Sequence, residues 1–295
     1  EHSRFREDFL NKDLISFEMI QKRFKREDWP ALVGVNFCGS IDEPTSHPEF
    51  FQIVEFFKEW NININIATNG SIRTEQWWAR LGETLKGTAH MVHWGIDGVD
   101  EVSEQYRIGS KYKKVEKNFR AYNAAGGRST WQFIVMEHNE HQLPLLEEKA
   151  KEEGFVATKI IYSNRAHNKN KVEYVKPEVE EAPEVECRYL NEGYVFINHK
   201  GDVIPCCYMN NEHLETASPN YKPSGNPNRQ RYVDMWMEHG GPLSTNMKYN
   251  EIKDVINGDF FDSVAESWNQ KPLLDRCENF CKKKKQSVFE KNKLE

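Results

Sequence analysis

The strongest constraint on the fold is an alternation of short apolar segments with amphipathic helical segments in the first half of the chain. Five segments have the length and composition of strands, at residues 31–40, 61–68, 89–96, 130–136 and 156–162. Apolar residues recur at helical spacing before and between them, at 14–26, 47–60, 74–85, 111–125 and 143–153. Successive βα units of this kind predict an α/β fold with a parallel sheet, either an open barrel or a doubly wound sheet.

The composition is that of a folded chain with one large domain and a small appendage. Of 295 residues, 38% are hydrophobic and 29% charged, so both a core and a hydrated surface are available. The net charge of -6 argues against a nucleic-acid partner, and no apolar run is long enough to span a bilayer. The opening residues lack the apolar core of a secretion signal. We therefore expect a cytoplasmic protein that binds neither membrane nor nucleic acid.

Small or hydrogen-bonding residues follow every predicted strand. They are found at 39–45, 68–70, 95–98, 137–139 and 163–165. Ordinary turn chemistry explains any one of these clusters. The carboxyl ends of parallel strands share one edge of the sheet, where ligands of such folds bind. Recurrence at all five strand ends therefore predicts a shared polar site.

Residues 164–186 are charged, contain two prolines and show no period, which predicts a linker. We expect a core domain at 1–163 and a second domain at 187–295. In the second domain, residues 194–198 and 202–204 have the pattern of a β-hairpin around a glycine turn. The Asn- and Pro-rich stretch at 209–230 is expected to be a surface loop, with a lid or substrate loop as the alternative.

The cysteines suggest a metal or cluster site in the second domain. Cys187 precedes the predicted hairpin and Cys206 follows it, so the hairpin brings both to one end. Cys277 and Cys281 are four residues apart, about one helical turn. Four thiolates suit either a tetrahedral zinc ion or an iron–sulfur cluster. Unliganded reduced cysteines are the alternative.

Two other cysteines are expected to have structural roles only. Cys38 lies in the first predicted strand, where a small buried residue is expected. Cys207 neighbours a predicted ligand but would point to the opposite side of an extended chain.

Together these features resemble the radical S-adenosylmethionine (SAM) enzymes that carry a C-terminal SPASM or Twitch auxiliary-cluster domain. The resemblance covers nearly the whole chain. It implies a partial (β/α)6 TIM-like barrel, with the first strand missing here, followed by a small β-hairpin and helix domain. The four cysteines Cys187, Cys206, Cys277 and Cys281 match the auxiliary domain's ligand pattern, with Gly201 at its usual place between the first two. The resemblance implies that they hold an auxiliary [4Fe–4S] cluster.

The resemblance also implies a SAM-binding site at the strand ends. The family's Gly-Gly-Glu-Pro-like segment appears in expanded form at 39–44, its Thr-Asn-Gly at 68–70 and its Tyr-Arg-x-Gly at 106–109. Its Ser-x-Asp-Gly strand end is present at 95–98 with Gly95 in place of the serine. The positions implied to bind SAM are Gly39, Ser40, Asp42, Glu43, Pro44, Thr68, Asn69, Asp97, Arg107 and Asn139.

One departure from the family pattern is large. The Cys-x3-Cys-x2-Cys loop that holds the SAM-binding [4Fe–4S] cluster in these enzymes does not occur in the 295 residues. The strand that precedes this loop is missing as well, which suggests a chain that lacks its N-terminal segment. We therefore expect no SAM cleavage by residues 1–295 alone.

The resemblance implies an enzyme that cleaves SAM reductively to a 5′-deoxyadenosyl radical, which then abstracts hydrogen from a peptide or protein substrate. An electron donor such as flavodoxin or ferredoxin is implied as a partner. Two alternatives remain open: a non-catalytic, barrel-derived binding protein and a zinc-stabilised α/β protein. Iron and sulfide content separates the zinc protein from the other two.

Overall fold

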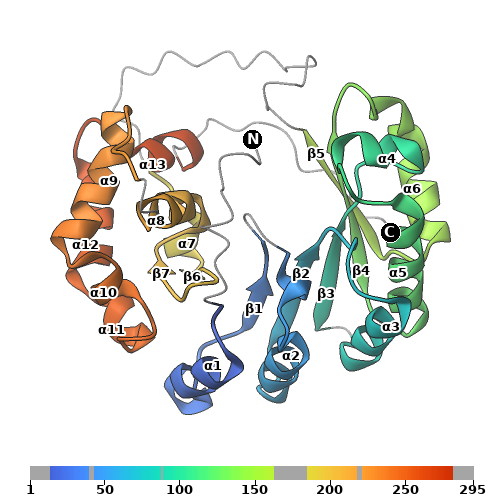
Figure 1. Cartoon of the computed structure of the whole chain (residues 1–295), viewed down its shortest axis with the longest axis horizontal. Helices are drawn as coiled ribbons and strands as arrows, with labels where there is room; N and C mark the ends of the chain where they lie inside the picture. The colour runs from blue at the N-terminus through green and yellow to red at the C-terminus, as the bar shows by residue number, and fades with distance from the viewer. Residues whose placement is uncertain (1–13, 40–42, 88, 163–184, 218–220, 282–295) are drawn as a thin grey trace. The chain divides into compact units, whose positions relative to one another are not determined.

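A computed structural model describes residues 14–39, 43–87, 89–162, 185–217 and 221–281. These residues form two compact units (Figure 1). We name residues 26–162 the sheet unit, and residues 14–25 together with 185–281 the cysteine unit. Residues 14–25 thus group with the C-terminal part of the chain, whereas the sequence predicts them within the first domain.

The sheet unit contains one five-stranded parallel sheet. Its strands are β1 (Gly34–Phe37), β2 (Asn63–Thr68), β3 (His90–Gly95), β4 (Ser129–Val135) and β5 (Ala157–Tyr162). They lie side by side in chain order, and every neighbouring pair is parallel. The predicted α/β architecture with a parallel sheet is confirmed.

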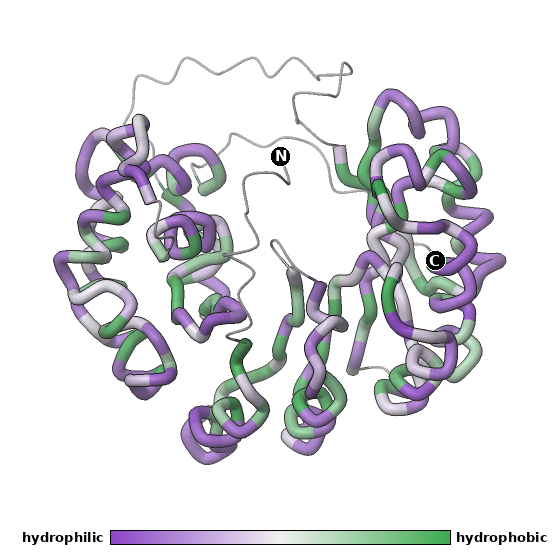
Figure 2. The backbone as a smooth tube through the Cα atoms, viewed as in Figure 1, coloured by the Kyte–Doolittle hydropathy of each residue, from purple (hydrophilic) through white to green (hydrophobic). Residues whose placement is uncertain are grey.

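Helices cover one face of this sheet (Figure 1). They are α2 (Phe50–Glu59), α3 (Glu75–Thr84), α5 (Tyr112–Ala124) and α6 (Leu143–Glu152). A short helix α4 (Glu101–Tyr106) and the 3-10 turns η2 (Arg26–Asp28), η3 (Pro44–Ser46) and η4 (Glu140–Gln142) complete the unit. Figure 2 shows polar and apolar residues mixed along the helices, as expected for helices with one buried face.

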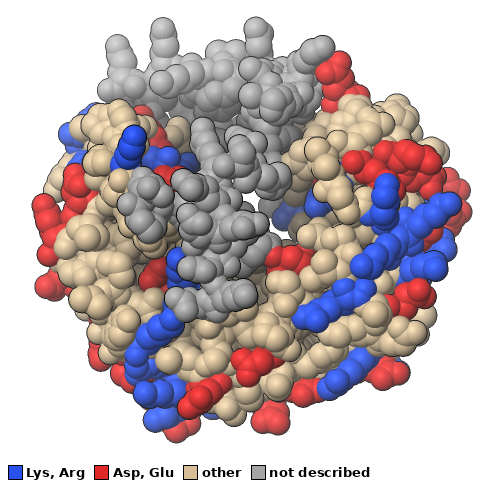
Figure 3. Space-filling model, in the orientation of Figure 1, with Lys and Arg blue, Asp and Glu red and all other residues tan. Residues whose placement is uncertain are grey.

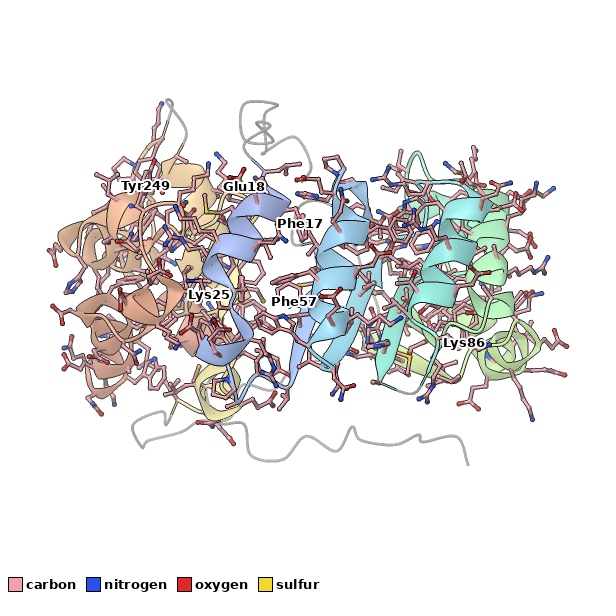
Figure 4. All side chains as sticks on the ribbon, turned by 90° about the horizontal axis from the view of Figure 1, so that it is seen from below. Phe17, Glu18, Lys25, Phe57, Lys86 and Tyr249 are labelled. Atoms are coloured by element: carbon pink, nitrogen blue, oxygen red, sulfur yellow. The ribbon has the colours of Figure 1, made fainter. Side chains whose placement is uncertain are left out.

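Aromatic side chains form the core between the sheet and its helices. Trp94 of β3 lies 4.5 Å from Trp78 of α3 and 6.1 Å from Phe119 of α5, measured between ring centroids. All three are completely buried. Phe57, which α2 carries (Figure 4), packs against the Phe37 ring at the end of β1. The alternate positions of the strands therefore face the helices, which leaves the other positions on the opposite face of the sheet.

The cysteine unit is built mainly from short helices. They are α1 (Phe17–Arg23), α7 (Arg188–Asn191), α8 (Asn210–Thr216), α9 (Pro227–Glu238), α10 (Gly241–Thr245), α11 (Ile252–Ile256), α12 (Asp259–Glu266) and α13 (Asp275–Phe280), with 3-10 turns η5 (Cys207–Met209) and η6 (Ser267–Asn269). The predicted hairpin is present as antiparallel β6 (Phe196–Ile197) and β7 (Val203–Ile204). The prediction of a surface loop at 209–230 is wrong for α8, which buries His213 and Leu214. A buried aromatic cluster contributed by α9 provides the apolar surface against which α8 packs.

Helix α1 belongs to the cysteine unit because its last residue is bound there. Figure 4 labels Phe17 and Glu18 at the start of α1 and Lys25 beyond its end. The buried Arg23 guanidinium donates to the Met247 and Lys248 carbonyls at 2.6 and 3.1 Å and pairs with Glu251. The backbone N–H of Ile15 also donates to the His199 carbonyl at 2.9 Å. These contacts explain why the helix groups with residues far away in the sequence.

The surface and the helix lengths agree with the composition. On the face drawn in Figure 3, acidic and basic side chains are interspersed. In the described ranges, no helix has both the length and the apolar character that crossing a membrane requires.

Candidate functional site

Glu43 connects the loop after β1 with the end of β2. Its Oε1 accepts hydrogen bonds from the hydroxyls of Thr45 and Thr68, each at 2.8 Å. Its Oε2 accepts from the backbone N–H of Asn69, also at 2.8 Å. A carboxylate oxygen has two lone pairs, so Oε2 retains room for a second donor. Glu43 therefore positions two adjacent strand ends and can still accept a hydrogen bond from a ligand.

The turn after β2 is held from within and from a helix. The Thr68 hydroxyl accepts from the Gly70 N–H at 2.9 Å, and the Asn69 side-chain oxygen accepts from the Ser71 N–H at 2.9 Å. Asn118 of α5 is buried and donates to the Gly70 carbonyl at 2.8 Å. Gly70 has φ +67, a conformation that favours glycine. The predicted Thr-Asn-Gly segment is therefore fixed in shape before any ligand binds.

Asp97 and Arg107 form a second polar group at the end of β3. Asp97 is completely buried; its Oδ1 accepts from the Ile134 N–H at 2.8 Å, and its Oδ2 lies 2.8 Å from Arg107 Nη2. A Cβ atom at Gly95 would lie only 2.7 Å from Arg107 Nη2. Gly95, where the resembling family has serine, therefore leaves the space that the guanidinium occupies.

The electrostatics of this pair leave the arginine able to bind an anion. Burial raises the pKa of Asp97 above its ordinary value, and the charge of Arg107 opposes part of that rise. Arg107 Nε is buried and has no hydrogen-bond partner in the described part of the chain. An orphaned guanidinium donor beside the strand ends fits a carboxylate such as the one that SAM carries.

Asn139 is also buried here, but its side chain is used within the protein. Its amide group donates to the carbonyls of Asp97 and Ile134 at 3.0 and 2.9 Å, and its oxygen accepts from the Met136 N–H at 2.7 Å. Asn139 thus joins the ends of β3 and β4 rather than presenting a free amide.

The positions predicted to bind SAM therefore fall into two bonded groups. Glu43, Thr68 and Asn69 form one, and Asp97, Arg107 and Asn139 form the other. Pro44 begins η3, and Gly39 is exposed after β1. Ser40 and Asp42 lie outside the described residues. Contact of each of these residues with SAM stays a prediction.

Sequence reasoning missed a polar row on the sheet face opposite the helices. Strand register pairs Gln132 with Lys159 on one side and with Gly95, two residues after His93, on the other. On the same face, the Asn65 amide donates to the Asn36 side chain at 2.9 Å. His93 Nδ1 is buried without a hydrogen-bond partner among the described residues. Central parallel strands are usually apolar on both faces. The alternating Asn residues of 61–65 and His93 were the available signal.

The four cysteines predicted as ligands line one cavity of about 70 Å³ in the cysteine unit. Cys206 and Cys277 are buried, whereas Cys187 and Cys281 are partly exposed. Apolar side chains form much of the wall, among them Met209, Phe261, Val264 and Trp268. The structure thus brings together thiols that are up to 94 positions apart in the sequence (187 to 281).

Local structure fixes the positions of the cysteines in each pair. Gly201, with φ +94, closes the hairpin turn whose second strand leads to Cys206. Buried Asp202 fixes this turn by accepting from the Asn198 and Asn246 amides at 2.9 and 2.8 Å. Cys281 ends α13, and its carbonyl accepts from the Glu186 N–H at 2.8 Å, which holds the segment carrying Cys187.

The cavity fits an iron–sulfur cluster. Trp268 lies in its wall, and its indole N–H interacts with the Cys277 sulfur, which favours the thiolate form of that cysteine. Burial raises the pKa of Cys206 to about 12 and that of Cys277 to about 11, and binding to a metal would stabilise the thiolate forms of both. Within the described residues, no three His, Cys, Asp or Glu side chains are grouped for a single ion. Cluster thiolates each bind a different iron, which suits cysteines spread around a cavity.

The two other cysteines differ from each other. Cys207 is not among the residues lining the cavity, and its sulfur lies 2.6 Å from the Tyr189 hydroxyl, in line with the expected structural role. The prediction that Cys38 is buried is wrong, because Cys38 is exposed. Strand β1 ends at Phe37 and lies at an edge of the described sheet, so Cys38 belongs to the loop that follows.

Comparison with known proteins agrees with this geometry. Residues 187–282 match the family model of the SPASM domain, an iron–sulfur cluster-binding domain. The match begins at Cys187 and includes the other three cysteines of the cavity. No match is found among the curated proteins.

Solved structures resemble most of the chain. Polyhistidine-tagged anSMEcpe with bound AdoMet superposes with a TM-score of 0.52 at 14% identity, over 84% of this chain and 70% of its own. Native anSMEcpe with bound AdoMet and Cp18Cys peptide gives 0.50 at 13% identity, over 88% and 74%. SuiB of Streptococcus suis bound to S-adenosylmethionine gives 0.47 at 15% identity, over 70% and 55%.

These comparisons define the fold and the C-terminal domain. The predicted partial TIM-like barrel is confirmed as the fold, because the chain shares the fold of anSMEcpe, which was solved with bound AdoMet. Residues 187–282 thus match an iron–sulfur cluster-binding domain of the SPASM family.

Proposed function

We propose that this protein is a radical SAM enzyme of the cytoplasm that modifies a peptide or protein. In this proposal Cys187, Cys206, Cys277 and Cys281 hold one auxiliary [4Fe–4S] cluster. The observation that carries the proposal is the single cavity lined by these four cysteines inside a segment that matches the SPASM domain. A peptide is the favoured substrate class because anSMEcpe, which has the same fold, binds the Cp18Cys peptide together with AdoMet.

The sheet unit would orient SAM. When bound and reduced, SAM supplies a 5′-deoxyadenosyl radical that abstracts hydrogen from the substrate, and the protein supplies binding and orientation. Glu43 Oε2 has acceptor capacity for the SAM ammonium, while Arg107 Nε is an unused donor for its carboxylate. The polar row that includes His93, Gln132 and Lys159 would face the rest of SAM or the substrate.

Reduction of SAM needs a cluster that these 295 residues do not supply. The Cys-x3-Cys-x2-Cys motif is absent from them, so the proposal places the SAM-binding cluster on a further N-terminal segment. Flavodoxin or ferredoxin would provide the electron. Residues 1–295 alone are expected to bind the auxiliary cluster but not to produce 5′-deoxyadenosine. Production of 5′-deoxyadenosine by this chain with iron, sulfide and reductant would contradict this assignment.

The test of the auxiliary site compares two neighbouring cysteines. The chain is purified anaerobically, reconstituted with iron and sulfide, and analysed for both elements and for visible absorption. We expect about four iron and four sulfide per chain, a loss of both in Cys206→Ser, and no loss in Cys207→Ser. Equal iron content in the two variants would refute the ligand assignment.

The same measurements separate the alternatives. Stoichiometric zinc without sulfide would support a zinc-stabilised protein and remove the radical SAM proposal. An intact cluster with no SAM binding, in a protein that includes the three-cysteine motif, would support a non-catalytic binding protein.

A further inference from the structure

A charged side chain forms part of the wall of the cysteine cavity. Arg276 precedes Cys277 on α13 and lines the same cavity as the four cysteines. Among the described lining residues other than these cysteines, Arg276 carries the one formal charge; the remainder are apolar or uncharged. Its side chain is 23% exposed, so the guanidinium is largely removed from solvent.

A buried carboxylate holds this arginine in place. Arg276 Nε lies 3.0 Å from Glu212 Oε1, and Glu212 of α8 is 1% exposed. Glu212 is held in turn by Arg229 of α9, whose Nε is 2.8 Å from the same oxygen and whose Nη2 is 2.8 Å from Glu215. Three helices therefore fix the position of the Arg276 guanidinium.

The charges behind Arg276 do not reach the cavity wall. Glu212, Glu215, Arg229 and Asp275, the last at 4.0 Å from Arg276 Nε, are all absent from the lining residues. They offset part of the positive charge of Arg276, but among the described residues Arg276 is the charged side chain that lines the cavity. A charge at the wall of an apolar cavity acts through a lower dielectric than one in water.

We propose that Arg276, held by Glu212, sets the reduction potential of the auxiliary cluster. The inference rests on the proposed function, since it requires that the cavity hold an iron–sulfur cluster. Reduction adds one electron to a site that already carries four thiolates, and a fixed positive charge at the wall favours that more anionic state. Net charge around a cluster is one of the protein's means of setting its potential. Arg276 would thus act on the reduction potential through its charge, without binding the cluster.

The test is a redox titration of the reconstituted protein, followed by visible absorption and electron paramagnetic resonance. We expect Arg276→Gln to make the cluster at least tenfold harder to reduce, a shift of about 59 mV to lower potential for one electron. Arg276→Lys retains the charge and should stay close to wild type. Arg231→Gln is the matched control, because Arg231 bonds to Pro272 and Gln270 and does not line the cavity.

An unchanged potential in Arg276→Gln, at full iron and sulfide content, would overturn the proposal, since a purely structural ion pair changes stability without changing the potential. If Arg276→Gln cannot hold the cluster, the lysine variant decides. A cluster retained at wild-type potential in Arg276→Lys supports a role for the charge; loss in both variants overturns it. Absence of a cluster from the wild-type chain would instead refute the proposed function.

Discussion

Replacing Arg107 by methionine tests how far the buried Asp97 depends on its arginine partner. The two side chains are 2.8 Å apart, and Asp97 is completely buried. Methionine fills part of the space but leaves the carboxylate without its compensating charge. Breaking a buried pair by removal of one partner costs about 3–5 kcal/mol. Because Asp97 keeps the Ile134 N–H and Arg107 is 22% exposed, we expect about 3 kcal/mol, at the lower end of that range.

The loss should depend on pH. Burial already raises the pKa of Asp97, and removing the opposing charge of Arg107 raises it further. A carboxyl with a raised native pKa binds more protons in the folded than in the unfolded state. Stability therefore falls as pH rises from the unfolded pKa, about 3.9, through the native value. Arg107→Met should be closer to wild type at pH 5 than at pH 8.

The measurement is native-state hydrogen exchange of peptides that cover β3 and β4, since it reports the sheet unit separately from the cysteine unit. Lys111→Met is the control, because it removes an exposed ion pair with Glu104 and should leave this protection unchanged. The double variant Asp97→Asn with Arg107→Met should recover part of the loss. Equal losses in Arg107→Met and Lys111→Met, or a loss in Arg107→Met that is the same at both pH values, would refute the reasoning.

Three further predictions concern Gly70, His213 and Glu43. Gly70→Ala should lower the free energy of unfolding by about 2–5 kcal/mol, because of strain at φ +67 and a Cβ that would lie 2.5 Å from Trp94. Gly193→Ala has the same φ but open space around it, so it should lose only the part due to strain. Chemical denaturation measures both. Burial lowers the pKa of His213 to about 3, so the cysteine unit should lose stability as pH falls below about 6.5. The loss should reach about 2 kcal/mol at pH 5. Hydrogen exchange in α8 measures it, and the His213→Gln variant should lack this dependence of stability on pH. Glu43→Gln places an amide donor against a backbone or hydroxyl donor. Hydrogen exchange of residues 63–72 should therefore become faster, and SAM binding should weaken about tenfold. A SAM affinity equal to that of the wild type would contradict the positioning role.

The alternation of strand and helix was readable from the sequence because it is local. Ile64, Ile66 and Thr68 of β2 alternate with less buried residues as the strand pattern predicts. Threonine is a favoured residue at helix N-caps, and the Thr74 hydroxyl accepts from the Trp77 N–H at 3.3 Å at the start of α3. The burial of Cys38 and the loop at 209–230 were predicted wrongly, because the edge position of β1 and the packing of α8 against α9 are tertiary features that leave no local pattern.

Residue types and spacing alone predicted that the four cysteines share one site, because one pair flanks a hairpin and the other lies within one helical turn. The structure does place all four around one cavity. The other residues of the cavity wall were found only in the tertiary structure. They include Trp268 and Arg276, and Arg276 pairs with Glu212, 64 residues away in the sequence. The anchoring of α1 by Arg23 to residues 247–251 is equally invisible in the sequence. Periodicity and short spacings depend on neighbouring residues and can be read from the sequence. The partner of a buried charge depends on the fold, because folding brings residues that are distant in the sequence together and out of water.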